Sequence, residues 1–525
     1  MSIFRSSVVA FLATGLTTAG LTAAGVTTAA QQPAVVEASP LQTKLDTLLA
    51  DSRFTGSQVG LVVRDAVTGE ELYDRNGGSR LLPASNLKLF TSTAAMDALG
   101  PDFWFHTDAL ATAPVLDGKL RGDLYLKGYG DPTTLASDYA ALAQQIAAAG
   151  IRRVDGDIIG DDSYFDDVRL GDTWSWDDEP FYYSAQISAL TVAPNTDYDS
   201  GTVIVQSAPG AAAGAPAQLT LVPQTSAVRL AGTVTTGAAG SANTLSIERE
   251  HGTNVVHVSG SVPLGSGTAL EWVTVWDPTS YAADVFRRAL VASGVEVRGG
   301  LRTGTTPATA RMLANDTSMT LGELLVPFLK LSNNMHAETL VKALGAVKAG
   351  SGTWSAGLGL VASYANSRGV DTGTIRLSDG SGLSRKDNLT PDAIADLLVA
   401  ARAEPWYQQW YDALPIAGNP DRFTGGTLRN RMRNTAAANN LHGKTGSLTG
   451  VTALSGYVTD ADGRKLVFSM VSNNFLSSPR SVEDAVGVTL ASYSETATVA
   501  AIRPAPAPAR ATSGDELECS WTKAC

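Results

Sequence analysis

Cysteine and histidine are scarce in this chain, and their scarcity excludes several kinds of chemistry. The 525 residues contain two cysteines, Cys519 and Cys525, and both stand in the C-terminal tail. A cysteine nucleophile or a cysteine-ligated metal in the body of the chain is therefore excluded, and a bond between the two cysteines would close only a short tail loop. Five histidines occur, and none belongs to an H-E-x-x-H motif of a zinc peptidase. We expect no metal and no other cofactor.

Positive charge is also in short supply. The chain has 39 lysines and arginines against 51 aspartates and glutamates, which gives a net charge of −12. This balance disfavours nucleic acid or an anionic membrane surface as a partner. Hydrophobic residues make up 44% and charged residues 17% of the chain, which is typical of a globular protein with a core. The length predicts more than one compact unit.

Long apolar runs are absent beyond the N-terminus, so no stable membrane span is expected in the mature protein. The N-terminus itself has the pattern of a secretory signal. Arg5 precedes a mildly apolar stretch over residues 8–26, and small residues follow at 28–30. We predict a signal peptide over residues 1–30 and a mature protein outside the cytoplasm, secreted or held in the cell wall or periplasmic space.

Apolar periodicity and turn residues divide the rest of the chain into three parts. Residues 104–272 contain short β-type segments separated by Gly, Asp and Asn, and we predict a mostly β insertion that forms two extra domains. Residues 41–103 and 273–496 are predicted to form one discontinuous domain around it. The Pro- and Ala-rich residues 497–525 are predicted to be a disordered tail.

The elements expected within these parts follow from the same patterns. Helices are expected over 41–49, 85–99, 139–149, 281–293, 321–329, 337–347, 391–402 and 481–493. Strands are expected over 58–65, 70–73, 122–127, 217–223 and 255–262, and two more between 448 and 473 joined by a turn at 460–463.

Three short motifs in a fixed order carry the functional signal. They are Ser85-Asn86-Leu87-Lys88, Ser332-Asn333-Asn334 and Lys444-Thr445-Gly446. They match the S-x-x-K, S-x-N and K-T-G set of serine acyl-transfer enzymes. Each motif alone is weak, since a second S-x-x-K stands at 520–523 in the tail. The order of the three, together with an Ala/Leu-rich helix after Ser85, identifies the set.

The first motif places a nucleophile beside a base. Residues three apart share one face of a helix, so Ser85 and Lys88 can meet. A serine hydroxyl is a poor nucleophile until a base removes its proton, and lysine is a base only when neutral. A second cation nearby, Lys444, would lower the pKa of Lys88. At a separation of ~4 Å and an effective dielectric of ~20 the repulsion is about 4 kcal/mol, or roughly three pKa units.

The second and third motifs are expected to complete the catalytic set. Ser332 would pass a proton to the leaving amine, and Asn334 would orient Lys88 and hold the substrate amide, although both residue types also suit a helix cap. Lys444 and its neighbours open the first of two paired strands, whose edge could bind a peptide.

The residues after Lys444 suit the substrate itself. Gly446 lets the backbone approach closely, and Lys444, Thr445 and Ser447 suit a terminal carboxylate. The N–H groups of Ser85 and Ser447 are expected to form the oxyanion hole.

Further motifs extend the likeness over nearly the whole mature chain, which resembles the low-molecular-mass class C penicillin-binding proteins, the D-Ala-D-Ala carboxypeptidase/endopeptidase family. The long stretch between Ser85 and Ser332 is also typical of that family. The supporting segments are Leu82-Pro83-Ala84-Ser85, Gly128-Tyr129-Gly130-Asp131-Pro132, Asp379-Gly380-Ser381-Gly382-Leu383-Ser384-Arg385 and Gly443-Lys444-Thr445-Gly446-Ser447-Leu448.

The resemblance implies an α/β (α+β) fold, with a penicillin-recognising, serine transpeptidase-like domain and two nested extra domains. It implies action on peptidoglycan stem peptides ending in D-Ala-D-Ala, through an acyl-enzyme on Ser85, and covalent inhibition by β-lactams. It also implies a pocket for the free amino end of the stem-peptide side chain. Trp174, Asp177 and Arg385 are the candidates for that pocket, and Trp176 and Asp178 are neighbours that suit it equally.

Other functions stay open at this point. A β-lactamase shares the acylation chemistry, but no E-x-x-L-N pattern stands between the second and third motifs, and ordinary β-lactamases lack the insertion. A non-catalytic module that binds peptidoglycan or senses β-lactams is a second alternative. A Ser-His-Asp hydrolase is disfavoured because no G-x-S-x-G elbow accompanies a suitable serine. The balance of carboxypeptidase, endopeptidase and transpeptidase activity does not follow from these residues.

Overall fold

The structure, a computed structural model, describes residues 39–496. The predicted signal peptide (1–30), the predicted tail (497–525) and both cysteines lie outside the described residues. Across 39–496, every helix is too short or too polar to traverse a lipid bilayer.

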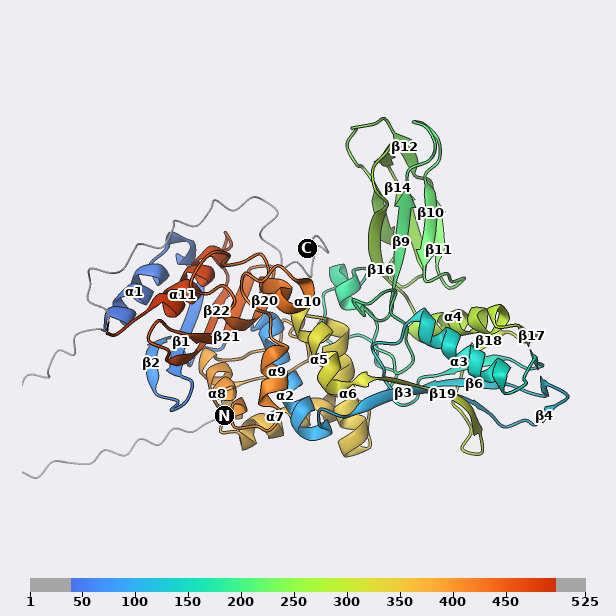
Figure 1. Cartoon of the computed structure of the whole chain (residues 1–525), viewed down its shortest axis with the longest axis horizontal. Coiled ribbons are helices and arrows are strands. Elements are labelled where there is room, and N and C mark those ends of the chain that lie inside the picture. Colours follow the sequence, from blue (N-terminus) through green and yellow to red (C-terminus); the bar gives the residue numbers. More distant parts are fainter. Residues whose placement is uncertain (1–38, 497–525) are drawn as a thin grey trace, which may run out of the picture. The chain divides into compact units, whose positions relative to one another are not determined.

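The central element is a five-stranded antiparallel sheet in the order β2-β1-β22-β21-β20 (Figure 1). Strand β1 pairs with β22 along its whole length, so segments from the two ends of the described chain lie side by side. Strand β20 is an edge strand. The strand bounds are β1 (Gln58–Asp65), β2 (Glu71–Arg75), β20 (His442–Leu448), β21 (Val451–Thr459) and β22 (Lys465–Asn473).

The third motif lies in β20, the first of a pair with β21, and this strand is additional to the two expected between 448 and 473. The two strands expected between 448 and 473 are β21 and β22, and β20 precedes them. Gly450, with a φ of +72°, allows the tight turn between β20 and β21. Lys444 is therefore the third residue of an edge strand.

Helices cover both faces of this sheet, because alternate residues of its strands point to opposite sides. Val62 and Val467 pack into one apolar cluster, whereas Leu61 and Leu466 pack into another. The first cluster lies against α2 (Lys88–Leu99), α5 (Leu321–Lys330), α6 (Asn334–Ala349), α7 (Trp354–Ser367) and α8 (Pro391–Ala401). The second lies against α1 (Pro40–Leu49) and α11 (Arg480–Ser492).

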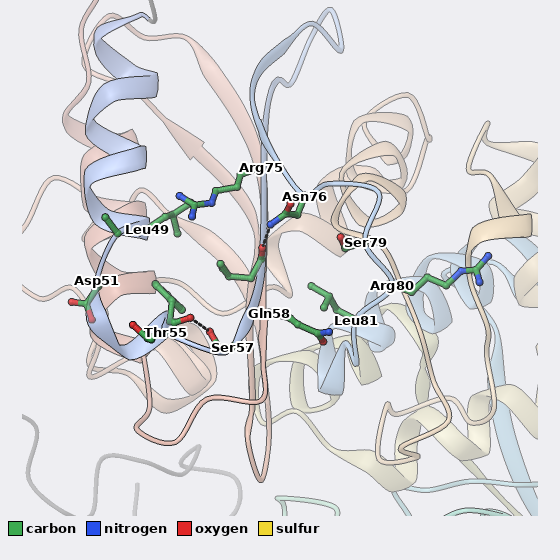
Figure 2. Close-up of a pocket in the computed structure, with 13 residues that line it drawn as sticks. Leu49, Asp51, Thr55, Ser57, Gln58, Arg75, Asn76, Ser79, Arg80 and Leu81 are labelled. Carbon is green, nitrogen blue, oxygen red and sulfur yellow. Dashed lines mark hydrogen bonds between the residues drawn. The ribbon is translucent and has the colours of Figure 1, made fainter.

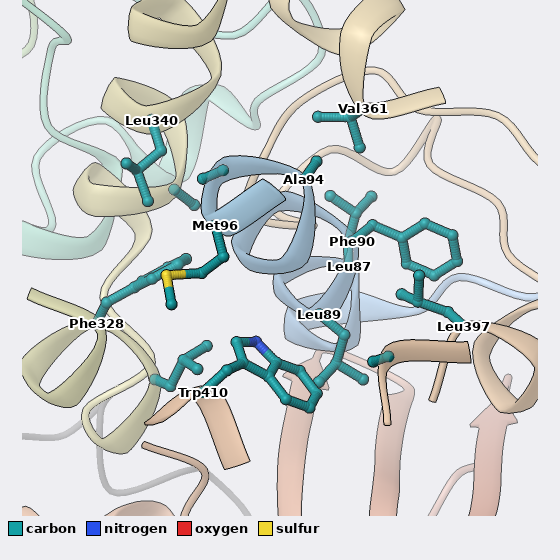
Figure 3. Close-up of a cluster of buried hydrophobic side chains, with 14 of the residues drawn as sticks. Leu87, Leu89, Phe90, Ala94, Met96, Phe328, Leu340, Val361, Leu397 and Trp410 are labelled. Carbon is teal, nitrogen blue, oxygen red and sulfur yellow. The ribbon is translucent and has the colours of Figure 1, made fainter. Parts of the chain in front are cut away.

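Helix α2 is enclosed on nearly every side. Its buried residues include Leu89, Phe90 and Met96, and Figure 3 shows them among Phe328 of α5, Leu340 of α6, Val361 of α7, Leu397 of α8 and Trp410 of α9 (Tyr407–Asp412). Dense packing of this kind holds a helix in one position. The residue at the start of α2, Lys88, is fixed with it.

The inserted region includes β3 (Trp104–Ala111) and extends further than residue 272. Strands β18 (Leu301–Thr303) and β19 (Arg311–Thr320) belong to the sheet β18-β8-β6-β3-β19, and α4 (Pro278–Ala292) packs into the same cluster as its strands. The predicted boundary at 272/273 therefore falls before the last elements of the insertion. The helical periodicity of α4 suggested that the chain had returned to the discontinuous domain around the insertion, here called the outer domain. Periodicity shows that a helix has an apolar face, but only its contacts show which core that face joins.

The first part of the insertion is α/β rather than mostly β. Strand β8 pairs in parallel with both β6 and β18, and parallel neighbours need a crossover, which α3 (Ala136–Ala148) and α4 provide. A four-stranded sheet, β17-β7-β5-β4, accompanies it. The remaining bounds are β4 (Val115–Leu116), β5 (Lys119–Leu120), β6 (Leu124–Gly128), β7 (Arg153–Val154), β8 (Ile158–Asp161) and β17 (Glu296–Val297).

The second part of the insertion is β-structured. It contains the sheets β10-β9-β16 and β11-β14-β13 and the pair β12-β15. Their bounds are β9 (Thr202–Ala208), β10 (Gln218–Val222), β11 (Arg229–Gly232), β12 (Thr235–Gly237), β13 (Ser246–Arg249), β14 (Val255–Ser259), β15 (Ser261–Pro263) and β16 (Ala269–Thr274). The short helix α10 (Arg422–Gly425) follows the insertion in sequence and belongs to the outer domain.

Candidate active site

Ser85 lies in a 3₁₀ turn, η2 (Ala84–Leu87), that leads directly into α2. The predicted helix therefore begins as a tighter turn, and Lys88 is its first α-helical residue. Ala84 has a φ of +46°, a left-handed value that costs a residue with a Cβ about 1–3 kcal/mol. Strain of this size is maintained only where the surrounding packing fixes the backbone.

Lys88 joins the first two motifs. Its Nζ donates to Ser85 Oγ at 2.9 Å, to Asn334 Oδ1 at 2.7 Å and to the carbonyl oxygen of Ser381 at 2.9 Å. The Lys88 side chain is fully buried, and Asn334 opens α6. The serine and lysine expected to meet on one helix face are thus in contact.

Lys444 joins the third motif to the second. Its Nζ donates to Ser332 Oγ at 2.7 Å and to the Thr445 carbonyl oxygen at 2.8 Å, and its side chain is fully buried. Ser332 has a φ of +60°, a left-handed backbone conformation, and lies two residues before the start of α6. The three motifs therefore form one hydrogen-bonded cluster.

Gly446 is the point at which β20 packs against the nucleophile turn. A Cβ at this position would lie 2.8 Å from the Pro83 carbonyl oxygen and 3.1 Å from the Ser85 nitrogen. Asn86 Nδ2 adds a bond to the Lys444 carbonyl oxygen at 3.0 Å. A side chain at 446 would push the turn and the strand apart.

The free edge of β20 is open only along part of its length. Gly443 N–H donates to the Pro415 carbonyl oxygen, and Ala417 N–H donates to that of Leu441, so residues 415–417 cover the start of the strand. Backbone groups alternate in direction along a strand. Since Gly443 points away from β21, Thr445 and Ser447 point to the same, open side, which places their N–H groups where a bound peptide would pair.

A buried loop, residues 379–384, supplies the third acceptor of Lys88, and sequence reasoning missed the residue that holds it. Glu338, one turn after Asn334 on α6, accepts from the N–H groups of Gly380 and Ser381, both at 2.8 Å, and from Trp354 Nε1 at 2.7 Å. Burial and the neighbouring Asp379 carboxylate raise the pKa of Glu338 to about 7. The i, i+4 spacing from Asn334 was the available signal.

The three candidates for the side-chain pocket differ in position. Trp174 is half-buried and its Nε1 donates to Asp379 Oδ2 at 3.0 Å, and Arg385 donates to the Thr449 carbonyl oxygen at 3.1 Å. Asp177 has an exposed side chain. Its neighbour Asp178 lies closer to the cluster.

Asp178 is connected to the second motif through Tyr183. The Tyr183 hydroxyl donates to Asp178 Oδ1 at 2.9 Å, and the Tyr183 carbonyl oxygen accepts from Asn334 Nδ2 at 2.8 Å. Burial raises the pKa of Asp178, although the Tyr183 hydroxyl and the Arg385 guanidinium both favour its charged form. Of the two adjacent aspartates, Asp178 is therefore the one beside the motif cluster.

Another residue at the open strand edge was not foreseen. Arg480, the first residue of α11, donates to Ser447 Oγ at 3.3 Å. It stands far from the K-T-G motif in the sequence, and only the packing of α11 on β21 brings it there. It adds a cation to the part of the strand that suits a carboxylate.

His442 contacts Tyr411 rather than the side chains of the motif cluster. It stacks on Tyr411 with ring centroids 4.2 Å apart, and burial lowers its pKa to about 4, so the ring is neutral at pH 7. A pocket of about 560 Å³ lies beside β1 and β2, near the opposite edge of the central sheet, and is lined by residues such as Asp51, Arg75 and Arg80 (Figure 2). The residues that line it include no member of the three motifs.

Possible metal ligands gather elsewhere as well. In the part of the chain that the structure describes, one group of three acids could offer ligand atoms to one ion, namely Glu71, Asp74 and Asp392. It lies on β2 and α8 and shares no residue with the motif cluster.

Comparisons with known proteins give one consistent family. The sequence pattern of the D-Ala-D-Ala carboxypeptidase 3 (S13) family matches residues 41–493. The chain is 47% identical to a D-alanyl-D-alanine carboxypeptidase of Actinomadura sp. (strain R39), over 94% of this chain and 93% of that protein. It is 27% identical to the D-alanyl-D-alanine carboxypeptidase DacB of Haemophilus influenzae, over 80% of this chain and 86% of the relative.

The fold matches a solved structure from the same bacterium. The crystal structure of penicillin-binding protein 4 of Haemophilus influenzae superposes with a TM-score of 0.74 at 25% identity, and covers 86% of this chain and 99% of that one.

Proposed function

The chain belongs to the D-Ala-D-Ala carboxypeptidase 3 (S13) family, and we propose that it releases terminal D-alanine from peptidoglycan stem peptides through an acyl-enzyme on Ser85. The observation that carries this proposal is the position of Lys88 Nζ, which bonds Ser85 Oγ, Asn334 and the Ser381 carbonyl at once. A lysine so placed can take the proton of the hydroxyl while the hydroxyl attacks.

Acylation follows from these contacts. Lys88 accepts the proton as Ser85 Oγ bonds to the carbonyl carbon of the D-Ala-D-Ala amide, and the negative charge moves to the carbonyl oxygen. The N–H groups of Ser85 and Ser447 stabilise that oxygen, and each donor of this kind contributes about 3–4 kcal/mol. Collapse breaks the C–N bond, and the proton that Lys88 accepted passes through Ser332, which Lys444 holds, to the amine of the departing D-alanine, so that Lys88 is neutral again.

Deacylation returns the enzyme to its first state. A water molecule loses a proton to the same base and attacks the ester carbon, and Ser85 leaves with a proton from Lys88. The peptide departs one residue shorter. If an amine replaced the water, the same centre would form a new peptide bond, and if the cut amide joined two stems, it would act as an endopeptidase.

The terminal carboxylate of the substrate would lie beside β20. Lys444, Thr445 and Ser447 support this position, and Arg480 adds a second cation close to Ser447. Gly446 lets β20 pack closely against the nucleophile turn, so a peptide paired with the open edge of the strand would lie next to Ser85.

The stem-peptide side chain would reach towards Trp174 and Arg385. Asp178, which the Tyr183 hydroxyl bonds and whose charged form the Arg385 guanidinium favours, is a better candidate than Asp177 for a free ammonium group. We propose that β-lactams acylate Ser85 as substrate mimics, and that the enzyme works outside the cytoplasm, where its substrate is found.

The test uses the wild-type enzyme and Ser85→Ala on three substrates. Wild type should release D-alanine from a D-Ala-D-Ala peptide and bind fluorescent penicillin covalently, and Ser85→Ala should do neither, with a loss of at least about 10⁴-fold in kcat/KM. Labelling that survives in Ser85→Ala would refute the nucleophile. Rapid release of the bound penicillin would identify a β-lactamase instead. Mass spectrometry of cross-linked fragments would separate carboxypeptidase from endopeptidase cutting.

A further inference from the structure

A second hollow, of about 430 Å³, lies within the insertion, between the loop that follows β8, the residues just before α4 and the end of β18. Its lining combines Asp167, Arg169, Gln186, Trp276, Asp277 and Thr303. It contains none of the residues of the proposed acylation site. The lining therefore mixes an indole ring with carboxylates, an amide, a hydroxyl and a guanidinium group.

Trp276 is exposed but held rigidly by its backbone. Its N–H donates to Asn254 Oδ1 and its carbonyl oxygen accepts from Asn254 Nδ2, both at 2.7 Å, while 37% of the residue remains exposed. Both bonds use main-chain atoms and so hold the backbone of Trp276 in place. The indole lines the hollow and is partly exposed, so a ligand could cover it.

The other wall of the hollow is attached to the catalytic helices. Lys342 of α6, fully buried, donates to Asp166 Oδ1 and to the Val168 carbonyl oxygen. Arg169 makes an ion pair with Asp162, and its carbonyl oxygen accepts from the N–H of Ile187. The wall and the acylation site thus share one helix.

The hollow is also close to the acylation site. Tyr183 bonds Asn334 through its carbonyl oxygen, and Gln186, only three residues later, lines the hollow. Three residues span at most ~11 Å. A stem peptide of a few residues that lies in the acylation site could therefore place the group at its far end in this hollow.

The chemistry of the lining selects among ligands. Asp167 and Asp277 would repel a phosphate or another polyanion, and the one guanidinium, which Arg169 shares between Asp162 and Asp277, does not offset both carboxylates. A sugar ring suits the lining, since it has an apolar face for the indole and hydroxyl and amide groups that both donate and accept hydrogen bonds. Small-molecule sites usually combine an aromatic or apolar surface with a small number of polar groups that point towards the ligand.

We propose that this hollow is a subsite for an amino-sugar ring of the glycan strand to which the stem peptide is attached. The proposal rests on the proposed function, because it assumes a peptidoglycan substrate. It deepens that function: the enzyme would bind a stem peptide that still carries its sugar more tightly than the free peptide.

The test compares two substrates with the same pentapeptide, one free and one linked to its disaccharide. For wild type, we expect a lower KM for the disaccharide-linked peptide. In Trp276→Ala the KM for that substrate should rise about tenfold with kcat unchanged, since the loss is one of binding alone. The values for the free peptide should not change. Asp167→Ala, on the exposed side of the hollow, should shift the same KM in the same direction.

Trp104→Ala is the matched control, because Trp104 is also an exposed tryptophan but lies on β3, outside the hollow. It should leave both substrates unaffected. Binding of the peptide-free disaccharide, followed by NMR of the tryptophan indole signals, should perturb the Trp276 signal and disappear in Trp276→Ala. Equal KM values for the two substrates in wild type, or equal effects of Trp276→Ala on both, would overturn the subsite. Absence of D-alanine release from either substrate would instead refute the proposed function, and the disaccharide titration would still decide the subsite.

Discussion

The central sheet and the β-structured part of the insertion differ in how they are covered. Strand β21 is buried along eight consecutive residues, whereas β14 alternates between buried and exposed positions. Helices enclose the first from both sides, and water reaches one side of the second. The enclosed region contains Lys88 and Lys444, whose side chains are fully buried. Interactions between charged groups are stronger there because the local dielectric is low.

The two regions also use charge differently. In the insertion, His257 and Glu250 approach to 3.6 Å with more than half of each side chain exposed, an arrangement that contributes little to stability. Beside the central sheet, Lys88 and Lys444 bond hydroxyl groups and main-chain carbonyls. We infer that the domain around the insertion carries the chemistry. Four substitutions would sharpen or break this contrast.

Lys444→Ala should have the largest effect of the four. It removes a buried cation from Ser332 and from the proposed carboxylate position, so kcat/KM for a peptide with a free terminal carboxylate should fall about 10²–10³-fold. A peptide with an amidated terminus should lose less. The measurement is D-alanine or D-alaninamide release from the two peptides. Lys342→Ala is the control, because it removes a buried lysine outside the motif cluster. It should lower stability without changing the ratio of the kcat/KM values for the two peptides. Equal losses on both peptides in Lys444→Ala would count against the carboxylate role.

Gly446→Ala should come next. The added Cβ would lie 2.8 Å from the Pro83 carbonyl oxygen, and displacement of the nucleophile turn by a fraction of an ångström to one ångström costs up to about 10²-fold in rate. The rate of labelling by fluorescent penicillin measures it. Gly463→Ala is the control, because Gly463 has a φ of +85° and a Cβ added there would meet no other atom within 4 Å. That variant should lose stability but keep its acylation rate, and a normal rate in Gly446→Ala would show that the turn can adapt.

Glu338→Gln should show how the ionisation of a buried acid makes the free energy of unfolding depend on pH. The pKa of Glu338 in the folded protein, about 7, lies above its ordinary value of 4.5, so the unfolded chain gives up this proton first and the folded state loses stability as pH rises from about 4.5 to about 7. Glutamine cannot ionise. The unfolding free energy of wild type minus that of Glu338→Gln, from urea titrations, should therefore decrease across this range.

Glu323 provides a control of opposite sign. The Thr320 N–H and hydroxyl groups lower the pKa of this exposed side chain, so its contribution is present at high pH and is lost as pH falls. The difference between wild type and Glu323→Gln should therefore increase, slightly, with pH. Slopes of the same sign for the two variants would contradict the assignment of Glu338.

His257→Ala should have the smallest effect. Its side chain is mostly exposed, and its partner Glu250 is too, so we expect a change in unfolding free energy within about 0.5 kcal/mol and no change in D-alanine release. Thermal unfolding and the release assay measure both quantities. A large loss of activity would mean that this strand takes part in the reaction, and the contrast between the two regions would fail.

Much of the outer domain could be predicted from the sequence. The predicted family and fold class are confirmed by the family match and by the superposed structure. Helices such as 391–402 and strands such as 58–65 were predicted within a few residues, because caps, turns and apolar periodicity are local signals. The end of the insertion was not, since α4 has helical periodicity whichever core it joins.

The sequence by itself determined the pairing of Ser85 with Lys88, because three residues of a helical turn fix their separation whatever surrounds them. It also determined the three motifs and their order. Only the tertiary structure decided that Asp178 rather than Asp177 lies beside the cluster, that Glu338 holds the loop under Lys88, that residues 415–417 cover part of β20 and that Arg480 reaches Ser447. These contacts join elements far apart in the chain, and their geometry depends on how whole helices and sheets pack rather than on the spacing of nearby residues.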